Sequence, residues 1–190
     1  AEAVCGGPAA DLVGALVDKS LIVATPGGSG VMRYRMLETI HEYAVERAAE
    51  APDLRAEAER RRTAWVRALV EEAEPKLRSA AQLPWISRLE TELDNIRAAL
   101  HRAVAHGAED EAGTLALNMG WFWWLRNYRQ EAIDWLDRIL RLGATLDAHP
   151  AAPPVDPMDA FLTAPDAEAD HPRHPLRMDL RMLHLFLRSD

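Results

Sequence analysis

The sequence predicts a mainly α-helical protein with one β-hairpin, followed by antiparallel helical hairpins. Ala, Leu, Arg and Glu dominate the composition, whereas Ile, Val and Thr are sparse, and this bias favours helix over strand. Hydrophobic residues make up 48% of the 190 residues and charged residues 27%, which supplies enough apolar material for a core. No apolar run approaches the roughly 20 residues of a membrane span, so we expect no membrane contact.

The first fifty residues change from helix to strand and back to helix. Apolar residues share one face of a predicted helix over residues 9–19. Two short strand patterns, at 21–24 and 31–36, flank the turn residues Pro26 to Gly30, and this order predicts a β-hairpin. Helical spacing returns over residues 37–50. We therefore treat residues 1–50 as one module.

Helical spacing then dominates residues 54–146. Long amphipathic helices are predicted over 54–77 and 82–105, with apolar residues three and four positions apart. A helical hairpin follows over 108–126 and 128–142. Asn127 separates its two helices, and Gly143 is expected to end the second one.

The last third of the sequence contains a change in composition. Residues 147–174 hold six prolines and six acidic residues against a single basic one, Arg173, which predicts a poorly ordered linker. Met158, Phe161 and Leu162 could form one short docking turn within it. Leucines at helical spacing resume over residues 175–190, where a further helix is predicted to start.

Charge and cysteine content narrow the functional classes. The net charge of −8 argues against direct nucleic-acid binding by this segment, because binding to phosphates needs basic charge. A single cysteine, Cys5, cannot form an internal disulfide, so a cytoplasmic location is the simpler expectation. The histidines and carboxylates form no arrangement of nucleophile and base, and no metal-ligand spacing. We therefore predict neither a catalytic site nor a metal site.

Two stretches resemble a known family. Residues 16–23 (LVDKSLIV) and 33–44 (RYRMLETIHEYA) resemble the end of the winged-helix module in STAND ATPases of the NB-ARC type. These include bacterial antibiotic-pathway regulators and large ATP-binding relatives of the LuxR class. Residues 89–100 (LETELDNIRAAL) are similar to the helix that follows the winged helix in the same regulators. The two signatures occur in the family's order, and the first covers residues 1–50.

The resemblance implies that nucleotide chemistry lies outside this chain. A phosphate-binding loop ends in Gly-Lys-Ser or Gly-Lys-Thr, and this chain has none, so ATP or ADP and the domain that binds them are expected upstream. The family's Met-His-Asp motif matches Met36, Leu37 and Glu38. Leu37 replaces the histidine and cannot donate a hydrogen bond to a phosphate. Leu37 is therefore a nucleotide-sensor position without its histidine.

Residues 113–146 are similar to one tetratricopeptide unit of 34 residues. Gly120 and Ala132 lie twelve apart, where that repeat has small residues that let its two helices approach. The sequence departs from the pattern at Asn127, where a turn glycine is common, and Tyr128 comes one position early. An antiparallel helical repeat is the broader expectation.

The four consecutive aromatics at 121–124 cannot all enter one core, because consecutive helical residues point in different directions. Trp123 is expected to pack inside the repeat and Phe122 on a neighbouring helix. Contact with an adjacent helix pair is the simplest role for the others. The alternative is a partner-binding surface made of Trp121, Trp124, Tyr128 and Arg129, since aromatic and arginine side chains are enriched at binding hot spots.

Together these features predict a non-catalytic regulatory segment of a STAND-type, ATP-dependent transcriptional regulator. Residues 1–50 would help to hold the nucleotide domain closed, and the helical array would bind a protein or a small effector. The alternative is a stand-alone helical adaptor for protein–protein interaction without any link to a nucleotide.

Overall fold

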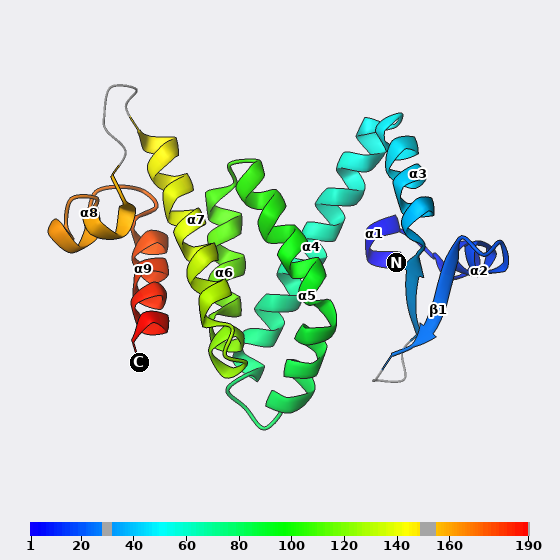
Figure 1. Cartoon of the computed structure of the whole chain (residues 1–190), viewed down its shortest axis with the longest axis horizontal. Coiled ribbons are helices and arrows are strands. Elements are labelled where there is room, and N and C mark those ends of the chain that lie inside the picture. The colour runs from blue at the N-terminus through cyan, green and yellow to red at the C-terminus, as the bar shows by residue number, and fades with distance from the viewer. Residues whose placement is uncertain (28–31, 149–154, 190) are drawn as a thin grey trace. The chain divides into compact units, whose positions relative to one another are not determined.

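The computed structural model describes residues 1–27, 32–148 and 155–189, and divides the chain into two compact units. The N-terminal unit spans Ala1–Trp65 and the C-terminal unit spans Val66–Asp190. The boundary falls inside a helix. The elements, coloured in order in Figure 1, are α1 (Glu2–Cys5), α2 (Ala10–Asp18), β1 (Ile22–Pro26), β2 (Met32–Met36), α3 (Glu38–Ala49), α4 (Pro52–Lys76), α5 (Gln82–Ala105), α6 (Glu109–Leu125), α7 (Arg129–Asp147), α8 (Pro157–Thr163) and α9 (His174–Arg188).

The N-terminal unit contains the predicted hairpin. Strands β1 and β2 pair antiparallel, with Ile22 opposite Met36 and Pro26 opposite Met32. The predicted loop residues 28–30 lie outside the described residues. Among the described apolar side chains of this unit, only Ala9 and Ile22 are buried, and neither α2 nor α3 buries any residue.

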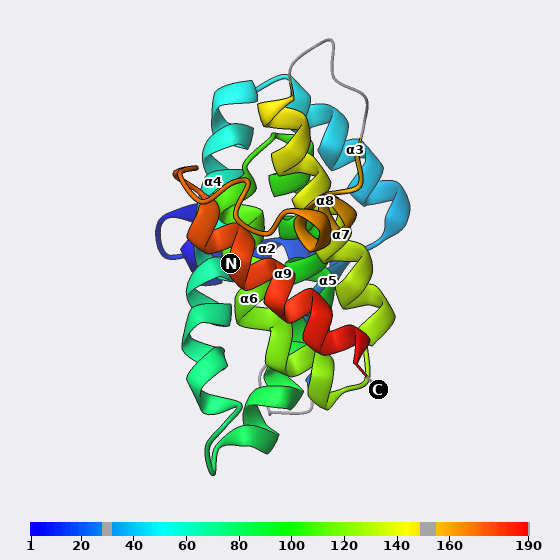
Figure 2. The ribbon, with the colours of Figure 1, turned by 90° about the vertical axis from the view of Figure 1, so that its left-hand side faces the viewer.

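The C-terminal unit has a continuous core between α5, α6, α7 and α9. Apolar residues at helical spacing line the facing sides of these helices, so each helix buries one face against its neighbours. Figure 2 shows α9 lying across α6 and α7. This arrangement confirms the predicted mainly α fold with helical hairpins. The largest fully buried apolar side chains are Trp123, Phe122, Leu77, Leu89, Ile96, Leu100, Leu115, Met119, Leu136, Ile139 and Leu180.

Tight turns connect α5 to α6 and α6 to α7. Gly107 follows α5 with a positive φ of 70°, and Asn127 separates α6 from α7 with a positive φ of 58°. Asparagine is one of the few side chains that tolerates this backbone region. The departure from a turn glycine at Asn127 therefore leaves the hairpin intact.

Two glycines have structural roles that differ from those predicted from the sequence. Gly143 does not end α7, which continues to Asp147. A Cβ atom at Gly143 would lie 2.4 Å from Oε1 of Glu109, so the glycine makes room for a buried side chain. Gly120 was expected to let α6 and α7 approach. Instead, a Cβ atom there would lie 2.8 Å from the side chain of Leu183, which belongs to α9.

Gly113 repeats the pattern of Gly120 seven residues earlier. A Cβ atom at Gly113 would lie 2.9 Å from the side chain of Leu176, also on α9. The pairs Gly113–Leu176 and Gly120–Leu183 keep the same sequence spacing on both helices. Helix α9 therefore runs parallel to α6, and two of its leucines pack on two glycines.

The described part of the predicted linker contains ordered elements. Helix α8 begins after Asp156, whose side chain accepts hydrogen bonds from the backbone N–H groups of Met158 and Asp159. This is an N-cap. Pro157 and Met158 are buried, so the sequence-predicted docking turn lies within this helix, with Met158 as its anchor. None of the described helices is both long and apolar enough to cross a membrane.

Candidate interaction surface

The aromatic run at the end of α6 divides between core and surface. Phe122 and Trp123 are buried, Trp121 is half-buried, and Trp124 is 37% exposed. The exposed and half-buried rings are three residues apart and therefore share one face of the helix. The run thus supplies both a core anchor and a surface.

The surface rings form a stacked cluster with a residue from α9. The rings of Trp121 and Trp124 stack with their centroids 4.8 Å apart. Phe186 approaches Trp124 with a centroid distance of 6.2 Å, and the guanidinium of Arg78 lies 6.0 Å from the Trp121 ring. Met182 lies four residues before Phe186 on the same face of α9, and both are almost half exposed. We call Trp121, Trp124, Met182 and Phe186 the aromatic surface.

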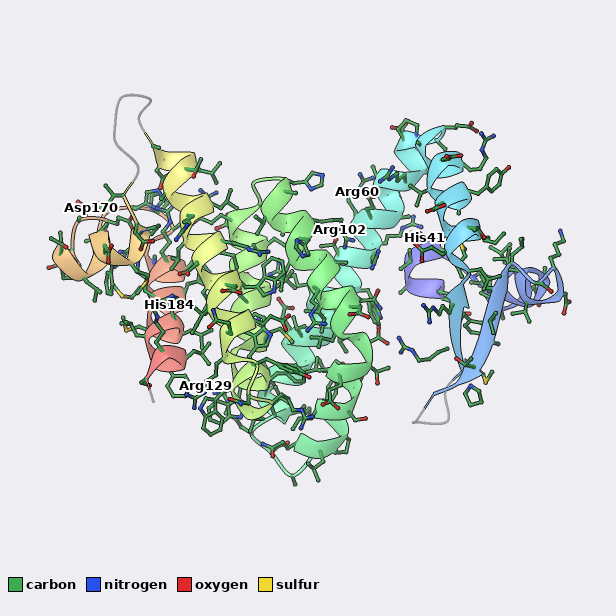
Figure 3. The ribbon with its side chains drawn as sticks, in the orientation of Figure 1. His41, Arg60, Arg102, Arg129, Asp170 and His184 are labelled. Atoms are coloured by element: carbon green, nitrogen blue, oxygen red, sulfur yellow. The ribbon has the colours of Figure 1, made fainter. Side chains whose placement is uncertain are left out.

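The other two residues predicted for a partner site point elsewhere. Tyr128 is half-buried, and its ring centroid lies 5.9 Å from that of the core residue Phe122. Arg129 donates a hydrogen bond from Nη1 to the carbonyl oxygen of Ser189 at 3.2 Å. Figure 3 shows Arg129 near the carboxyl end of α9. The structure therefore groups Trp121 with Trp124, whereas Tyr128 contacts the core and Arg129 bonds to the end of α9.

Sequence reasoning missed Phe186, Met182 and Arg78. Met182 and Phe186 recur at a spacing of four beside the leucine stripe of α9, so a second apolar face could be read from the sequence. The proximity of that face to Trp124 could not, because it depends on how α9 lies against α6.

A buried ion pair fixes α9 in that position. Nε and Nη2 of Arg177 donate hydrogen bonds to the two carboxylate oxygens of Glu109, at 2.6 and 2.9 Å. Both side chains are almost fully buried, and the space they need is the one that Gly143 leaves open. The Glu109 hydrogen bond is the main cause that raises the pKa of Arg177, so its charge is fixed. The pair joins the start of α6 to the first half of α9.

Further polar contacts extend this pair into a network that holds α9. Nη1 of Arg177 lies 2.5 Å from an oxygen of Asp147, at the end of α7. Partial burial alone would raise the pKa of Asp147. The hydrogen bond and charge of Arg177, together with those of His171, outweigh that effect and lower this pKa below its ordinary value. Arg181 donates to Glu168 at 2.5 Å, and its guanidinium lies 5.0 Å from the ring of Phe161 in α8.

His184 adds a contact from the middle of α9. Its Nε2 lies 2.9 Å from Oδ1 of Asp137 on α7, and the imidazole is buried. Figure 3 shows His184 on the side of α9 that faces α7. The aromatic surface is therefore built on a helix that polar contacts tie to both α6 and α7.

A polar groove lies between α5 and α7. It has a volume of about 340 Å³ and is lined by Arg97, His101, Glu131, Asp134, Trp135 and Arg138. Arg97 donates two hydrogen bonds of 2.7 Å to the carboxylate of Glu131. The edge of His101 meets Trp135 at a centroid distance of 4.6 Å, and Arg138 lies over the same ring. Charges of both signs already neutralise each other here, which makes the groove a weaker candidate than the aromatic surface.

The nucleotide-sensor position belongs to the N-terminal unit. Leu37 immediately precedes α3, has extended backbone (φ −66°, ψ 148°), and is 52% exposed. An exposed aliphatic side chain at this place can pack against a partner but offers no hydrogen bond to a phosphate. Within the described ranges, no group of three or more His, Cys, Asp or Glu residues is placed to hold a metal ion.

Comparison with known proteins gives one class of relative. Three curated proteins, one from Mycobacterium bovis and two from strains of Mycobacterium tuberculosis, are each provisionally named an HTH-type transcriptional regulator. Each is 34% identical to this chain over 125 residues, which is 66% of the chain but only 14% of the relative. The chain is thus a distant homologue of a short portion of these regulators. No family model matches it, and no solved structure matches it.

Proposed function

We propose that this chain is a non-catalytic regulatory segment of a STAND-type, ATP-dependent transcriptional regulator, and that it binds a protein or effector through its helical array. The observation that carries this proposal is the aromatic surface, which is exposed on helices that a buried ion-pair network locks together. A rigid helical scaffold with an exposed aromatic patch is suited to recognition.

The homology supports the regulatory part of this proposal. The chain matches a short stretch of proteins named as transcriptional regulators. Its residues 16–23, 33–44 and 89–100 resemble stretches of regulators that switch with a nucleotide. In such a switch, a ligand acts by binding one conformation better than the other. On this proposal the N-terminal unit contacts the nucleotide-binding domain, and the array receives the signal.

One test addresses the link between the array and transcription. Leu180 is fully buried in the core of the C-terminal unit, so Leu180→Asp in the full-length regulator should disrupt the array. We expect a promoter reporter to lose its response to the inducing signal while promoter binding in a gel-shift assay persists. A response equal to that of the unchanged regulator, at equal protein level, would overturn the proposal.

A second test addresses nucleotide binding. Because Leu37 offers no donor to a phosphate and the chain has no phosphate-binding loop, we expect this 190-residue chain to give no saturable heat with magnesium-ATP or ADP in titration calorimetry. Tight, stoichiometric binding of either nucleotide would contradict the assignment of nucleotide chemistry to another domain.

A further inference from the structure

The buried ionisable side chains of the described chain gather at the interface between α9 and its neighbours. They are Glu109, Arg177, Arg181 and His184. Three of them belong to α9, and Glu109 is the partner of Arg177. By contrast, every residue that α5 or α7 buries is apolar. Helix α9 is therefore attached to the array by a different chemistry from the one that packs the other helices together.

Charged contacts cross from α9 to both neighbouring helices. Arg177 lies 2.6 Å from Glu109 of α6 and 2.5 Å from Asp147 of α7. His184 lies 2.9 Å from Asp137 of α7. A complete buried pair adds little net stability, because its groups lose their hydration, but loss of one partner strongly disfavours burial of the other. The closed position of α9 therefore depends on these contacts being intact.

Two further atoms of α9 lack a partner. Nε of Arg181 and Nδ1 of His184 are buried and make no hydrogen bond to the described part of the chain. A buried polar atom without a partner costs free energy that is regained when the atom returns to water. Separation of α9 from α7 would therefore relieve part of the cost of holding it closed.

Part of the apolar contact of α9 is made with glycine. Leu176 packs on Gly113 and Leu183 on Gly120, where a Cβ atom would lie 2.9 and 2.8 Å from the leucine. A glycine has no side chain, so these contacts bury less apolar area than contacts between two large side chains. Leu180, between the two leucines in the sequence, is fully buried. We therefore expect the apolar attachment of α9 to be weaker than the packing among α5, α6 and α7.

Helix α9 can leave without separating the other helices. It packs on α6 and α7 (Figure 2), and the contacts of α6 with α5 and with α7 do not involve it. Met182 and Phe186, on another side of α9, are almost half exposed. Because local unfolding begins where few contacts hold an element, α9 is the one of these four helices that we expect to open first.

Opening of α9 would divide the aromatic surface. Trp121 and Trp124 stand on α6, whereas Met182 and Phe186 stand on α9. The stack of the two tryptophans lies within α6 and would survive. The contact of Phe186 with Trp124, at 6.2 Å between the ring centroids, would be lost. The complete surface therefore exists only when α9 is closed.

We propose that α9 is a clasp that opens and closes as one unit over α6 and α7, is held closed by its charged contacts, and completes the aromatic surface when closed. A partner that binds the complete surface would favour the closed form, because a ligand shifts the population toward the state that it binds better. This inference rests on the proposed function for the role of the aromatic surface, and adds the conformational change that would control it.

Hydrogen exchange of the 190-residue chain, measured by mass spectrometry of its peptides, tests the clasp. We expect the amides of α9 to be about tenfold or more less protected than those in the middle of α5, because α9 opens without global unfolding. The protection should be uniform from Leu180 to Leu187, since the helix opens as one unit. A gradient that falls toward Arg188 would instead indicate fraying of the helix end.

Two matched variants test the charged contacts. Asp137→Ala removes the partner of the buried His184, so the protection of the α9 amides should fall about fivefold or more. Asp134→Ala is the control, because Asp134 lies on the same helix, is exposed, and bonds to Gln130. It should leave the protection of α9 unchanged.

A core variant separates the opening of α9 from unfolding of the whole unit. Ile96 of α5 is fully buried, and α9 packs mainly on α6 and α7. Ile96→Val should lower the protection of α5 about threefold, because it removes a buried methyl group. It should leave the protection of α9 unchanged, since the core around Ile96 stays intact when the clasp opens.

Several results would overturn the clasp. These are equal protection of α9 and α5, a gradient along α9, equal losses at α9 and α5 in Ile96→Val, or an effect of Asp137→Ala no larger than that of Asp134→Ala. None of these results would alter the expected reporter response to Leu180→Asp, so the proposed function and the clasp are tested separately.

Discussion

The two units of the chain differ in how they bury apolar side chains. In the N-terminal unit, Leu12, Tyr34 and Tyr43 are each at least half exposed, although they stand in regular helices and a strand. In the C-terminal unit, residues as large as Phe122 and Trp123 are almost fully buried. Burial of apolar area is the main favourable term in folding, so the stability of the described chain is concentrated in the C-terminal unit.

Ion pairs differ between the units in the same way. In the N-terminal unit, exposed pairs join residues three or four apart on one helix, as in Arg47 with Glu50 and Arg61 with Glu57. The C-terminal unit joins distant segments through buried groups, as in Arg177 with Glu109. A local exposed pair adds little to stability, whereas breaking one side of a buried pair leaves an uncompensated charge. The C-terminal unit also has local exposed pairs, such as Arg67 with Glu71, so the difference between the units lies in its additional buried pairs between distant segments.

The largest expected effect comes from breaking the buried pair. Arg177→Met leaves Glu109 buried, and among the described residues Arg173, at 3.8 Å, is then the one cation within ion-pair distance. We expect a loss of about 3–5 kcal/mol in the free energy of unfolding of the C-terminal unit, measured by urea denaturation with tryptophan fluorescence.

Two further variants make this test specific. Glu109→Gln combined with Arg177→Met removes both charges and should recover most of the loss. Arg47→Gln breaks an exposed pair in the N-terminal unit, where each side chain is more than half exposed. It should change stability by less than about 0.5 kcal/mol. Equal losses for Arg177→Met and Arg47→Gln would show that burial does not distinguish the two units.

Smaller changes in stability, opposite in sign to each other, are expected when one glycine in each unit is replaced by alanine. A Cβ atom at Gly143 would lie 2.9 Å from Nη2 of Arg177 as well as close to Glu109, so Gly143→Ala should cost about 1–3 kcal/mol through overpacking. Gly14 lies within α2 and has no heavy atom within 4 Å of such a Cβ atom. Gly14→Ala should therefore stabilise its helix by about 0.5–1 kcal/mol.

Thermal unfolding followed by circular dichroism measures both glycine variants. Together, the two variants test whether Gly143 is needed because a larger residue would not fit, and whether Gly14 can be replaced without a steric conflict. Destabilisation by Gly14→Ala would contradict the open surroundings of α2, and stabilisation by Gly143→Ala would contradict the tight fit around Arg177.

The elements of both units could be predicted from sequence because they depend on local patterns. Spacings of three and four located α5 at the bounds observed, and turn residues between two strand patterns located the hairpin. The burial of Trp123 agrees with its expected place inside the tetratricopeptide-like hairpin. These features can be predicted because they depend on residues that are close in the sequence.

The partners of individual side chains could not be predicted in this way. Gly120 looked like a residue for the α6–α7 contact, yet it makes room for Leu183 on α9. Gly143 looked like a helix end, yet it makes room for Glu109. Arg177 and Glu109 are 68 residues apart, and only the packing of α9 on α6 brings them together. For the same reason the sequence indicated Trp121 and Trp124 as surface residues but not Phe186 beside them.

The smallest expected effect concerns the pH dependence that this network adds to the C-terminal unit. The pKa of Asp147 is lowered in the folded state, mainly because the hydrogen bond and charge of Arg177 outweigh the raising effect of burial. A carboxyl with a depressed folded pKa contributes stability above its unfolded value of about 4, and this contribution is lost as pH falls through the folded value.

Asp147→Asn should therefore be less stable than the unchanged chain at neutral pH, and the difference should shrink as pH falls below about 4. Because the side chain is 38% exposed, solvent screening limits the difference to about 1 kcal/mol or less. Urea denaturation across this pH range measures it, with Asp18→Asn of the N-terminal unit as a control for a carboxyl outside the network. A difference that stays constant down to about pH 2 would show that the Asp147 charge plays no part, and that the buried pair of Arg177 with Glu109 holds α9 without it.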